Sequence, residues 1–165
     1  MESVIIKKSK MFENRGNCFT IYDCRDSKIK FVQDKVSRSN IGVIRGFHGD
    51  DKTWKLISCL HGKIQLVTYN VDIDIKNTYI LDGEDSEFVS VLVPPRTLNA
   101  HQCLTKYCIF HYKWSEFYTG PEDQWSVYYN DSDISPHWDL TIASEISDRD
   151  SKAQDLKELK KSVCR

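Results

Sequence analysis

The residues best suited to metal or redox chemistry are spread along this chain without a ligand-like pattern. The 165 residues include five histidines and six cysteines, and no two cysteines form a Cys-x-x-Cys pair. Zinc knuckles and dithiol redox motifs depend on such pairs. No His-x-His pair lies near an acidic residue at metal-ligand spacing either. We therefore expect no metal, no cofactor, and cysteines that are reduced thiols.

Single side chains that can move a proton stand in segments rich in β-branched and aromatic residues. His48 ends the tetrapeptide Arg-Gly-Phe-His that begins at Arg45. In the segment 107–114 the even-numbered residues are Cys108, Phe110, Tyr112 and Trp114. Because side chains alternate along a strand, these four share one face. A lone histidine at a strand end, or a tyrosine in a sheet, is by itself more often structural than functional.

Short strands are the elements that must position these side chains. From Val4 to about Asn130, segments rich in Val, Ile, Tyr, Phe and Thr are broken by Gly, Asn, Asp or Pro, which is typical of an all-β sandwich or barrel. The clearest predicted strands are 18–22, 30–33, 41–47, 55–60, 63–71, 88–93 and 107–117, with a turn at His61-Gly62. Two sheets closed over each other would leave an interior pocket.

The C-terminal segment changes its period. Residues 151–161 carry two leucines among charged residues, which predicts one short surface helix with Asp150 or Ser151 as its N-cap. No internal repeat and no linker-like change of composition divides the chain. We therefore predict a single domain over residues 1–165 with a helical tail at about 151–161.

Composition and charge exclude several classes of protein. The chain is 40% hydrophobic and 28% charged, as in an ordinary folded domain. Its net charge of -1 creates no positive field that would attract nucleic acid. The apolar runs are far too short to span a membrane, and the first residues lack the apolar core of a secretory signal. We expect a cytoplasmic protein that binds neither nucleic acid nor membrane.

One stretch is more specific than composition can be. Residues 31–48, FVQDKVSRSNIGVIRGFH, resemble the dTDP-4-dehydrorhamnose 3,5-epimerase family. The similarity continues in order through KLISCLHG at 55–62, VPP at 93–95, YKWSEFY at 112–118, NDSDI at 130–134 and SDRD at 147–150. It therefore covers nearly the whole chain.

This resemblance implies a cupin-type jelly roll, usually a homodimer, that acts on a nucleotide-linked 4-keto-6-deoxy sugar. The ketone at C4 of such a sugar acidifies the protons on C3 and C5. Inversion of either carbon removes a proton from one face of the ring and returns one to the other face, through an enolate. The reaction needs a base, an acid opposite it and a group that stabilises the enolate.

Four residues match catalytic positions of the family. His48 matches the base, and Asp150 matches the carboxylate that hydrogen-bonds it, which would fix the imidazole tautomer and raise its basicity. Lys55 matches the lysine that stabilises the enolate through its charge. Tyr112 matches the tyrosine that returns a proton from the opposite face.

Other matches concern substrate binding. Arg15 and Arg45 match arginines that hold the diphosphate, a task that suits the fork of a guanidinium. Tyr118 matches a tyrosine that lines the substrate site, and its even spacing from Tyr112 predicts that both lie on one strand face. Gln33 matches a contact to the nucleotide.

The sequence departs from the family at three points. A gapless alignment places Asn99 where relatives carry a second histidine, whereas a two-residue slip would place His101 there. The gapless alignment matches more of the neighbouring residues. Lys35 stands where relatives often carry an asparagine that contacts the nucleotide, and the turn after His48 is about three residues shorter, which surface loops tolerate. These departures leave the nucleobase and the sugar open.

The sequence thus predicts an isomerase that epimerises C3, and C5 as well, of a nucleoside-diphosphate 4-keto-6-deoxyhexose or a related heptose, in the biosynthesis of deoxysugars and polysaccharides. Two alternatives stay open. A related cupin would epimerise C3 alone, or isomerise the ketone between C4 and C3 through the same enolate. A non-catalytic module would bind the nucleotide sugar only, which the asparagine at position 99 and the shortened turn would fit.

Overall fold

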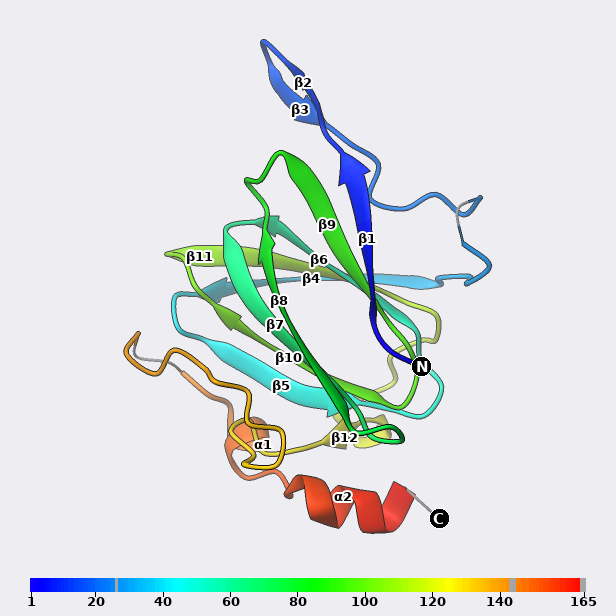
Figure 1. The fold of residues 1–165 in the computed structure, drawn as a ribbon, viewed down its shortest axis with the longest axis vertical. Helices are drawn as coiled ribbons and strands as arrows, with labels where there is room; N and C mark the ends of the chain where they lie inside the picture. The colour runs from blue at the N-terminus through cyan, green and yellow to red at the C-terminus, as the bar shows by residue number, and fades with distance from the viewer. Residues whose placement is uncertain (26, 143–144, 164–165) are drawn as a thin grey trace.

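Two antiparallel sheets of five strands each form the body of the protein (Figure 1). The computed structural model describes residues 1–25, 27–142 and 145–163. The two sheets lie over each other, and short turns join most of their strands. The predicted all-β jelly roll is confirmed.

The first sheet has the strand order β1-β9-β6-β11-β4. Its strands are β1 (Val4–Ser9), β4 (Gln33–Asn40), β6 (Lys55–His61), β9 (Glu87–Val93) and β11 (Tyr107–Trp114). The second sheet has the order β12-β5-β10-β7-β8. Its strands are β5 (Ile44–Gly49), β7 (Lys63–Asn70), β8 (Ile75–Asp82), β10 (Thr97–Cys103) and β12 (Trp125–Ser126). A hairpin of β2 (Met11–Glu13) and β3 (Gly16–Cys18) projects from both sheets at the top of Figure 1.

Two apolar clusters hold the sheets and the C-terminal segment together. One cluster lies between the sheets and joins residues of both, such as Ile57 and Phe110 from the first and Leu66 from the second. The other joins β5, β7 and β10 to the C-terminal segment, where Leu156 and Leu159 are buried. Leu98 and Ala100 of β10 belong to this second cluster. The residues of β10 that alternate with them therefore point to the opposite face, between the sheets.

The helical tail differs from the prediction in its bounds and caps. It consists of α1 (Asp148–Ser151) and α2 (Leu156–Val163), after a short η1 (Pro121–Asp123) earlier in the chain. Ser147 caps α1 and accepts the Asp150 N–H at 3.2 Å. Asp155 accepts the Glu158 N–H at 2.8 Å at the start of α2. The prediction that Asp150 or Ser151 is the N-cap is wrong, since Asp150 is buried and its carboxylate is used elsewhere.

Five of the seven predicted strands are present with shifted ends, whereas 18–22 and 30–33 are not strands beyond one terminal residue each. The aromatic residues of these two segments lie in loops, where they pack against other aromatic rings. Phe19 stacks on Phe88 at 4.3 Å between ring centroids, and Tyr22 meets Phe31 at 5.1 Å. The sequence pattern also does not predict β4, which is almost entirely polar, or β8 and β10, in which polar and apolar residues are mixed.

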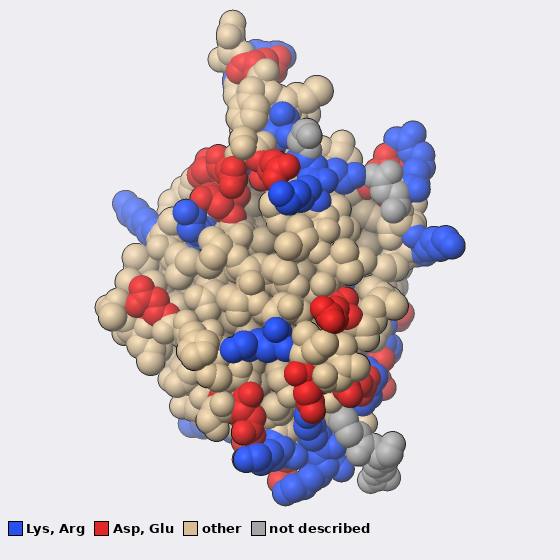
Figure 2. All heavy atoms as spheres, viewed as in Figure 1, with Lys and Arg blue, Asp and Glu red and all other residues tan. Residues whose placement is uncertain are grey.

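The surface agrees with the low net charge. On the face seen in Figure 2, acidic and basic side chains lie in small groups of both signs around an uncharged centre. Within the described part of the chain, no helix is long and apolar enough to cross a membrane.

Candidate active site

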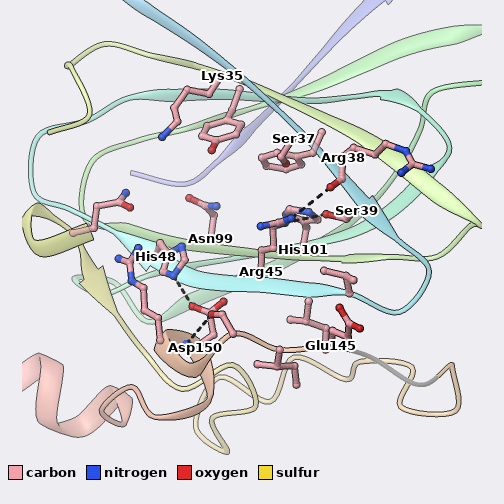
Figure 3. A pocket seen from close by; sticks show the side chains of 18 of the residues that line it. Lys35, Ser37, Arg38, Ser39, Arg45, His48, Asn99, His101, Glu145 and Asp150 are labelled. Atoms are coloured by element: carbon pink, nitrogen blue, oxygen red, sulfur yellow. Dashed lines mark hydrogen bonds and ion pairs between the residues drawn. The ribbon is translucent and has the colours of Figure 1, made fainter. Parts of the chain in front are cut away.

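A cavity of about 670 Å³ opens between the two sheets (Figure 3). Small-molecule sites commonly have volumes of roughly 300–1,000 Å³. Seven of the nine predicted site residues line the cavity: Arg45, His48, Lys55, Asn99, Tyr112, Tyr118 and Asp150. The structure therefore brings together side chains that are as far apart in sequence as positions 45 and 150.

His48 and Asp150 form a buried pair at the base of the cavity. The Nε2 atom of His48 lies 2.7 Å from Oδ1 of Asp150, and the side chains are 23% and 4% exposed. Burial lowers the pKa of His48, against the opposing effect of the Asp150 carboxylate. Burial alone would raise the pKa of Asp150, but the hydrogen bond and charge of His48 outweigh it, so this pKa is lowered. Both shifts favour a neutral imidazole beside an ionised carboxylate.

Gly46 makes room for this pair. A Cβ at position 46 would lie 2.6 Å from the carbonyl oxygen of Asn99 and 2.7 Å from the Cβ of Ala100 on β10. The glycine also has φ +114, which disfavours any other residue. Its N–H donates to the second carboxylate oxygen of Asp150 at 3.2 Å. The Arg-Gly-Phe-His motif thus brings the backbone of β5 close to β10 and leaves an amide for Asp150.

Lys55 begins β6 in the opposite sheet and is 3% exposed. Its Nζ donates to Oδ1 of Asn99 at 3.1 Å and lies 4.9 Å from the ring centroid of Trp114. Burial lowers the pKa of Lys55 to about 8, and the positive charges of Arg149 and Lys35 act in the same direction. A partly desolvated ammonium of this kind gains from any negative charge that develops beside it.

Tyr112 lines the cavity from β11, so its wall is opposite that of His48 on β5. Its ring packs between Phe110 at 4.9 Å and Trp114 at 5.8 Å, which confirms the face predicted from the alternation. Burial raises the pKa of Tyr112, although the charge of Arg45 opposes the shift. The phenol therefore keeps its proton and can donate it.

Tyr118 reaches the cavity by a different route from the one predicted. Strand β11 ends at Trp114, so Tyr118 does not share a strand face with Tyr112. Its backbone N–H donates to Oε1 of Gln33 at 2.9 Å, and its ring meets that of Trp114 edge to face at 5.4 Å. Gln33 is not among the residues that line the cavity. It holds Tyr118 in place instead.

Arg15 lies outside the cavity of its own chain. It occupies the turn of the β2–β3 hairpin, where its side chain is 84% exposed and pairs with Glu13 at 2.7 Å. Arg45, the other predicted arginine, does line the cavity and donates from Nε to Oγ of Ser39 at 2.9 Å. Only one of the two predicted phosphate ligands therefore lines the cavity.

Asn99 and His101 both line the cavity, on either side of a bulge in β10. Asn99 is the register partner of His48 and the acceptor for Lys55. His101 is 2% exposed, stacks on Phe110 at 4.0 Å, and its Nε2 has no partner. Burial lowers the pKa of His101 to about 3, so the ring is neutral. Of the two, Asn99 is the one that hydrogen-bonds Lys55.

Sequence reasoning missed Ser37 and Ser39 on β4 and Arg149 on α1 as lining residues, and named Lys35 only as a departure from the family. Lys35, Ser37 and Ser39 alternate along β4 and share its inner face. The ammonium of Lys35 lies 3.4 Å from the ring centroid of Tyr118. Every residue of β4 except Val36 is polar, so no alternation in the sequence marked this cavity-lining strand. Arg149 also lines the cavity, and no periodic signal marked it.

The charges that line the cavity are mainly positive. Four cationic side chains line it, against the two carboxylates of Glu145 and Asp150; the cationic residues are Lys35, Arg45, Lys55 and Arg149, whereas the guanidinium of Arg38 lies over the Tyr107 ring on the outer face. In the described ranges, no group of three or more His, Cys, Asp or Glu side chains is arranged to hold a metal ion. The cavity is therefore suited to an anionic organic ligand with a centre for proton transfer at one end.

Known proteins with similar sequences share one description. Residues 1–158 match the family model of dTDP-4-dehydrorhamnose 3,5-epimerase. The enzyme of this name from Escherichia coli is 29% identical over 96% of this chain and 92% of its own length. Its counterpart from Salmonella typhimurium is 28% identical over 91% of this chain and 88% of its own.

Solved structures agree with the sequence comparison. The dTDP-6-deoxy-D-glucose-3,5-epimerase of Legionella pneumophila, in complex with dTDP-4-keto-L-rhamnose, has a TM-score of 0.85 and 26% identity over 94% of this chain and 88% of its own. The dTDP-4-dehydrorhamnose 3,5-epimerase of Bacillus anthracis, with TDP and pyrophosphate bound, has a TM-score of 0.83 and 25% identity over 93% and 94%. The expected cupin fold and isomerase class are confirmed, and the chain belongs to the dTDP-4-dehydrorhamnose 3,5-epimerase family.

Proposed function

We propose that this protein epimerises C3 and C5 of a nucleoside-diphosphate 4-keto-6-deoxy sugar, with dTDP as the nucleotide and deoxysugar biosynthesis as the pathway. The observation that carries the proposal is the placement of His48 and Tyr112 on opposite walls of one cavity. Inversion of a carbon needs a base on one face of the ring and an acid on the other. The names of the relatives support dTDP as the carrier.

His48 takes the proton from carbon. Its Nε2 faces the Asp150 carboxylate at 2.7 Å, so the Nε2–H donates to Asp150 and the lone pair of Nδ1 is left for the substrate. The lowered pKa of His48, caused first by burial, keeps the ring neutral at pH 7. When the ring gains the proton, the ionised carboxylate beside it stabilises the imidazolium.

Lys55 and Tyr112 complete the proton transfer. As the C–H bond breaks, negative charge moves to O4, where the buried ammonium of Lys55 would stabilise the enolate more than it could in water. Tyr112, protonated because burial raises its pKa, then donates a proton to the opposite face of the carbon. Each carbon is inverted by one such cycle, and no cofactor takes part.

Exchange with heavy water tests the proposal directly. The enzyme is incubated in D2O with dTDP-4-keto-6-deoxyglucose, and deuterium at C3 and C5 is followed by NMR. Incorporation at both carbons with inverted product is the expected result. Incorporation at C3 alone would reduce the activity to that of a C3 epimerase. No incorporation at either carbon, with this or any other nucleoside-diphosphate 4-keto sugar, would refute the catalytic role.

We further propose that the protein works as a homodimer in which Arg15 contributes to the partner's site. The β2–β3 hairpin, whose turn carries Arg15, projects from the body of the protein (Figure 1), and Arg15 is not among the residues that line the cavity. Two residues of the same hairpin, Met11 and Phe12, are 72% and 62% exposed. Large exposed apolar side chains on a projecting hairpin are typical of a surface that docks on another chain.

Subunit complementation tests this dimer. Arg15→Ala and His48→Ala are each expected to be inactive or strongly impaired. In a mixed dimer, one site combines the intact cavity of the Arg15→Ala protomer with the intact hairpin of the His48→Ala protomer. We expect activity to return when the two variants are dissociated and reassembled together. A monomer in sedimentation, or no recovery in the mixture, would contradict the shared site.

We also propose a cytoplasmic location. The described cysteines are free thiols, three of them buried, which fits a reducing compartment. Fractionation of cells with an antibody against the protein tests this placement, and recovery outside the cytoplasmic fraction would contradict it.

A further inference from the structure

Arg149 is a cavity residue to which neither the family matches nor the proposed steps assign a role. It follows Asp148 in α1 and lines the cavity beside Asp150. Its Nε donates to Oγ of Ser126 at 2.9 Å, and its guanidinium also donates to the carbonyl oxygen of Pro121 at 3.2 Å. Neither contact is with a carboxylate. The positive charge is therefore fixed in position by neutral acceptors and is not neutralised by them.

The anchor of Arg149 lies next to the base. Ser126 of β12 is the register partner of His48 on β5. The next residue after Arg149, Asp150, makes the contact to Nε2 of His48. The segment 149–150 thus brings a fixed positive charge near, and a fixed negative charge into contact with, the same imidazole.

The groups around His48 come from every neighbouring element. Helix α1 supplies Asp150 and Arg149, β6 supplies Lys55, and β12 supplies the uncharged Ser126. Strand β10 supplies the uncharged Asn99 and the buried His101, whose pKa is lowered by burial first and also by the charge of His48. The charges that act on His48 are the Asp150 carboxylate and the cations of Arg149 and Lys55. The buried carboxylate favours the cationic imidazole, which cannot accept a proton; burial opposes this first, and the two cations add to the effect of burial.

We propose that Arg149 is a positioning residue for proton transfer: its anchored guanidinium acts together with burial to hold His48 in the neutral form that accepts a proton, and adds a second positive charge to that of Lys55 at the enolate. This inference rests on the proposed function for its catalytic meaning. The same guanidinium acts on Lys55, whose pKa of about 8 is lowered by burial first and by Arg149 in addition.

The removal of this charge has a distinctive expected result. In Arg149→Gln, both His48 and Lys55 should bind their protons more tightly. In the profile of kcat/KM against pH, the acid limb reports a base that must be neutral, and the alkaline limb reports an ammonium that must be charged. We expect both limbs to move to higher pH by about 0.5 to 1 unit, with kcat about 10-fold lower. Arg149→Lys should restore both limbs.

An NMR titration makes the test independent of turnover. The imidazole signal of His48 is assigned by comparison with His48→Gln, and its pKa is measured in the wild type and in Arg149→Gln. Lys152→Gln is the matched control, because Lys152 at the end of the same segment is 73% exposed and pairs with Asp148. We expect the pKa of His48 to rise in Arg149→Gln and to stay unchanged in Lys152→Gln.

The outcomes separate this inference from the proposed function. An unchanged pKa of His48 in a folded Arg149→Gln variant would overturn the role of Arg149, whatever the activity. A fall in kcat with unmoved limbs would reduce Arg149 to a structural anchor. A wild type without isotope exchange would remove the proposed function, while the titration would still decide whether Arg149 controls the protonation of His48.

Discussion

Two histidine–aspartate pairs among the described residues have nearly the same length and different surroundings. His48 Nε2 lies 2.7 Å from Asp150, and His111 Nε2 lies 2.8 Å from Asp34. Both histidine side chains are largely buried, at 23% and 8% exposed. Hydrogen-bond geometry alone therefore does not distinguish a catalytic base from a structural histidine.

The carboxylates and the strand faces make the difference. Asp150 is 4% exposed, whereas Asp34 is 54% exposed and also pairs with Lys113 at 2.7 Å. His111 alternates with Tyr112 along β11 and so points to the face away from the cavity. A base needs a substrate cavity on its free side and a carboxylate that no lysine has already neutralised.

The largest expected effect separates the two histidines. His48→Ala should lower isotope exchange at both C3 and C5 by about 10⁴-fold, the upper range for loss of a general base. His111→Gln should keep exchange within about twofold and lower the melting temperature instead, since it disturbs a buried hydrogen bond. Exchange rates and thermal denaturation of both variants check this. Equal exchange in His48→Ala and the wild type would disprove the assignment.

A second pair of variants compares two tyrosines on β11. Tyr112→Phe should slow net inversion by about 10²- to 10³-fold but slow isotope wash-out much less, because the base still removes the proton. Tyr107→Phe is the control, since Tyr107 stacks on His61 at 4.7 Å, away from the cavity. Parallel losses of inversion and wash-out in Tyr112→Phe would show that Tyr112 is not the returning acid.

The effect of substitution on activity should differ less between the two aspartates than between the two histidines. Asp150→Asn removes the charge that stabilises the imidazolium, and we expect a loss of about 10²-fold in kcat/KM. Asp34→Asn should leave kcat/KM within about twofold, because its carboxylate faces solvent and Lys113. Steady-state kinetics with matched circular dichroism spectra measure both. A greater loss in Asp34→Asn than in Asp150→Asn would reverse the comparison.

The pH dependence of the wild type sharpens the comparison further. Activity should rise as His48 loses its proton, at a pH below its ordinary value of 6.5 because burial lowers its pKa. It should fall as Lys55 loses its proton, at a pH of about 8. A profile of kcat/KM against pH should therefore be bell-shaped. An acid limb above pH 7 would mean that Asp150 outweighs burial at His48.

The sequence predicted the strands that are rich in apolar residues, because these residues are buried in the core. Strands β6, β7, β9 and β11 follow from their β-branched and aromatic residues, and the His61-Gly62 turn is present with φ +72 at Gly62. Strands β4 and β10 could not be found this way, because the inner faces that line a cavity are polar. Their strand structure comes from pairing with β11 and with β5 and β7, which no local pattern records.

The sequence motifs predicted most of the site residues. Where the structure differs from this prediction, tertiary contacts explain the difference. Tyr118 reaches the cavity through a loop held by Gln33, not through strand alternation. Arg149 lines the cavity because the C-terminal segment packs against β12, a contact that no sequence pattern indicates. Lys35 was noticed as a difference from relatives, but its contact with the Tyr118 ring depends on how β4 and the loop after β11 meet.

The catalytic base and its carboxylate partner lie far apart in the sequence, and this has a consequence for partial unfolding. His48 and Asp150 are 102 residues apart, and the backbone near Asp150 is attached to the β12 region by the Tyr129 N–H at 3.2 Å and the Tyr128 N–H at 2.9 Å. If this attachment opens, both sheets keep their ladders while the imidazole loses its partner. During gentle denaturation, catalysis should therefore disappear before the sheet signal changes, and inactivation would report an early local opening rather than global unfolding.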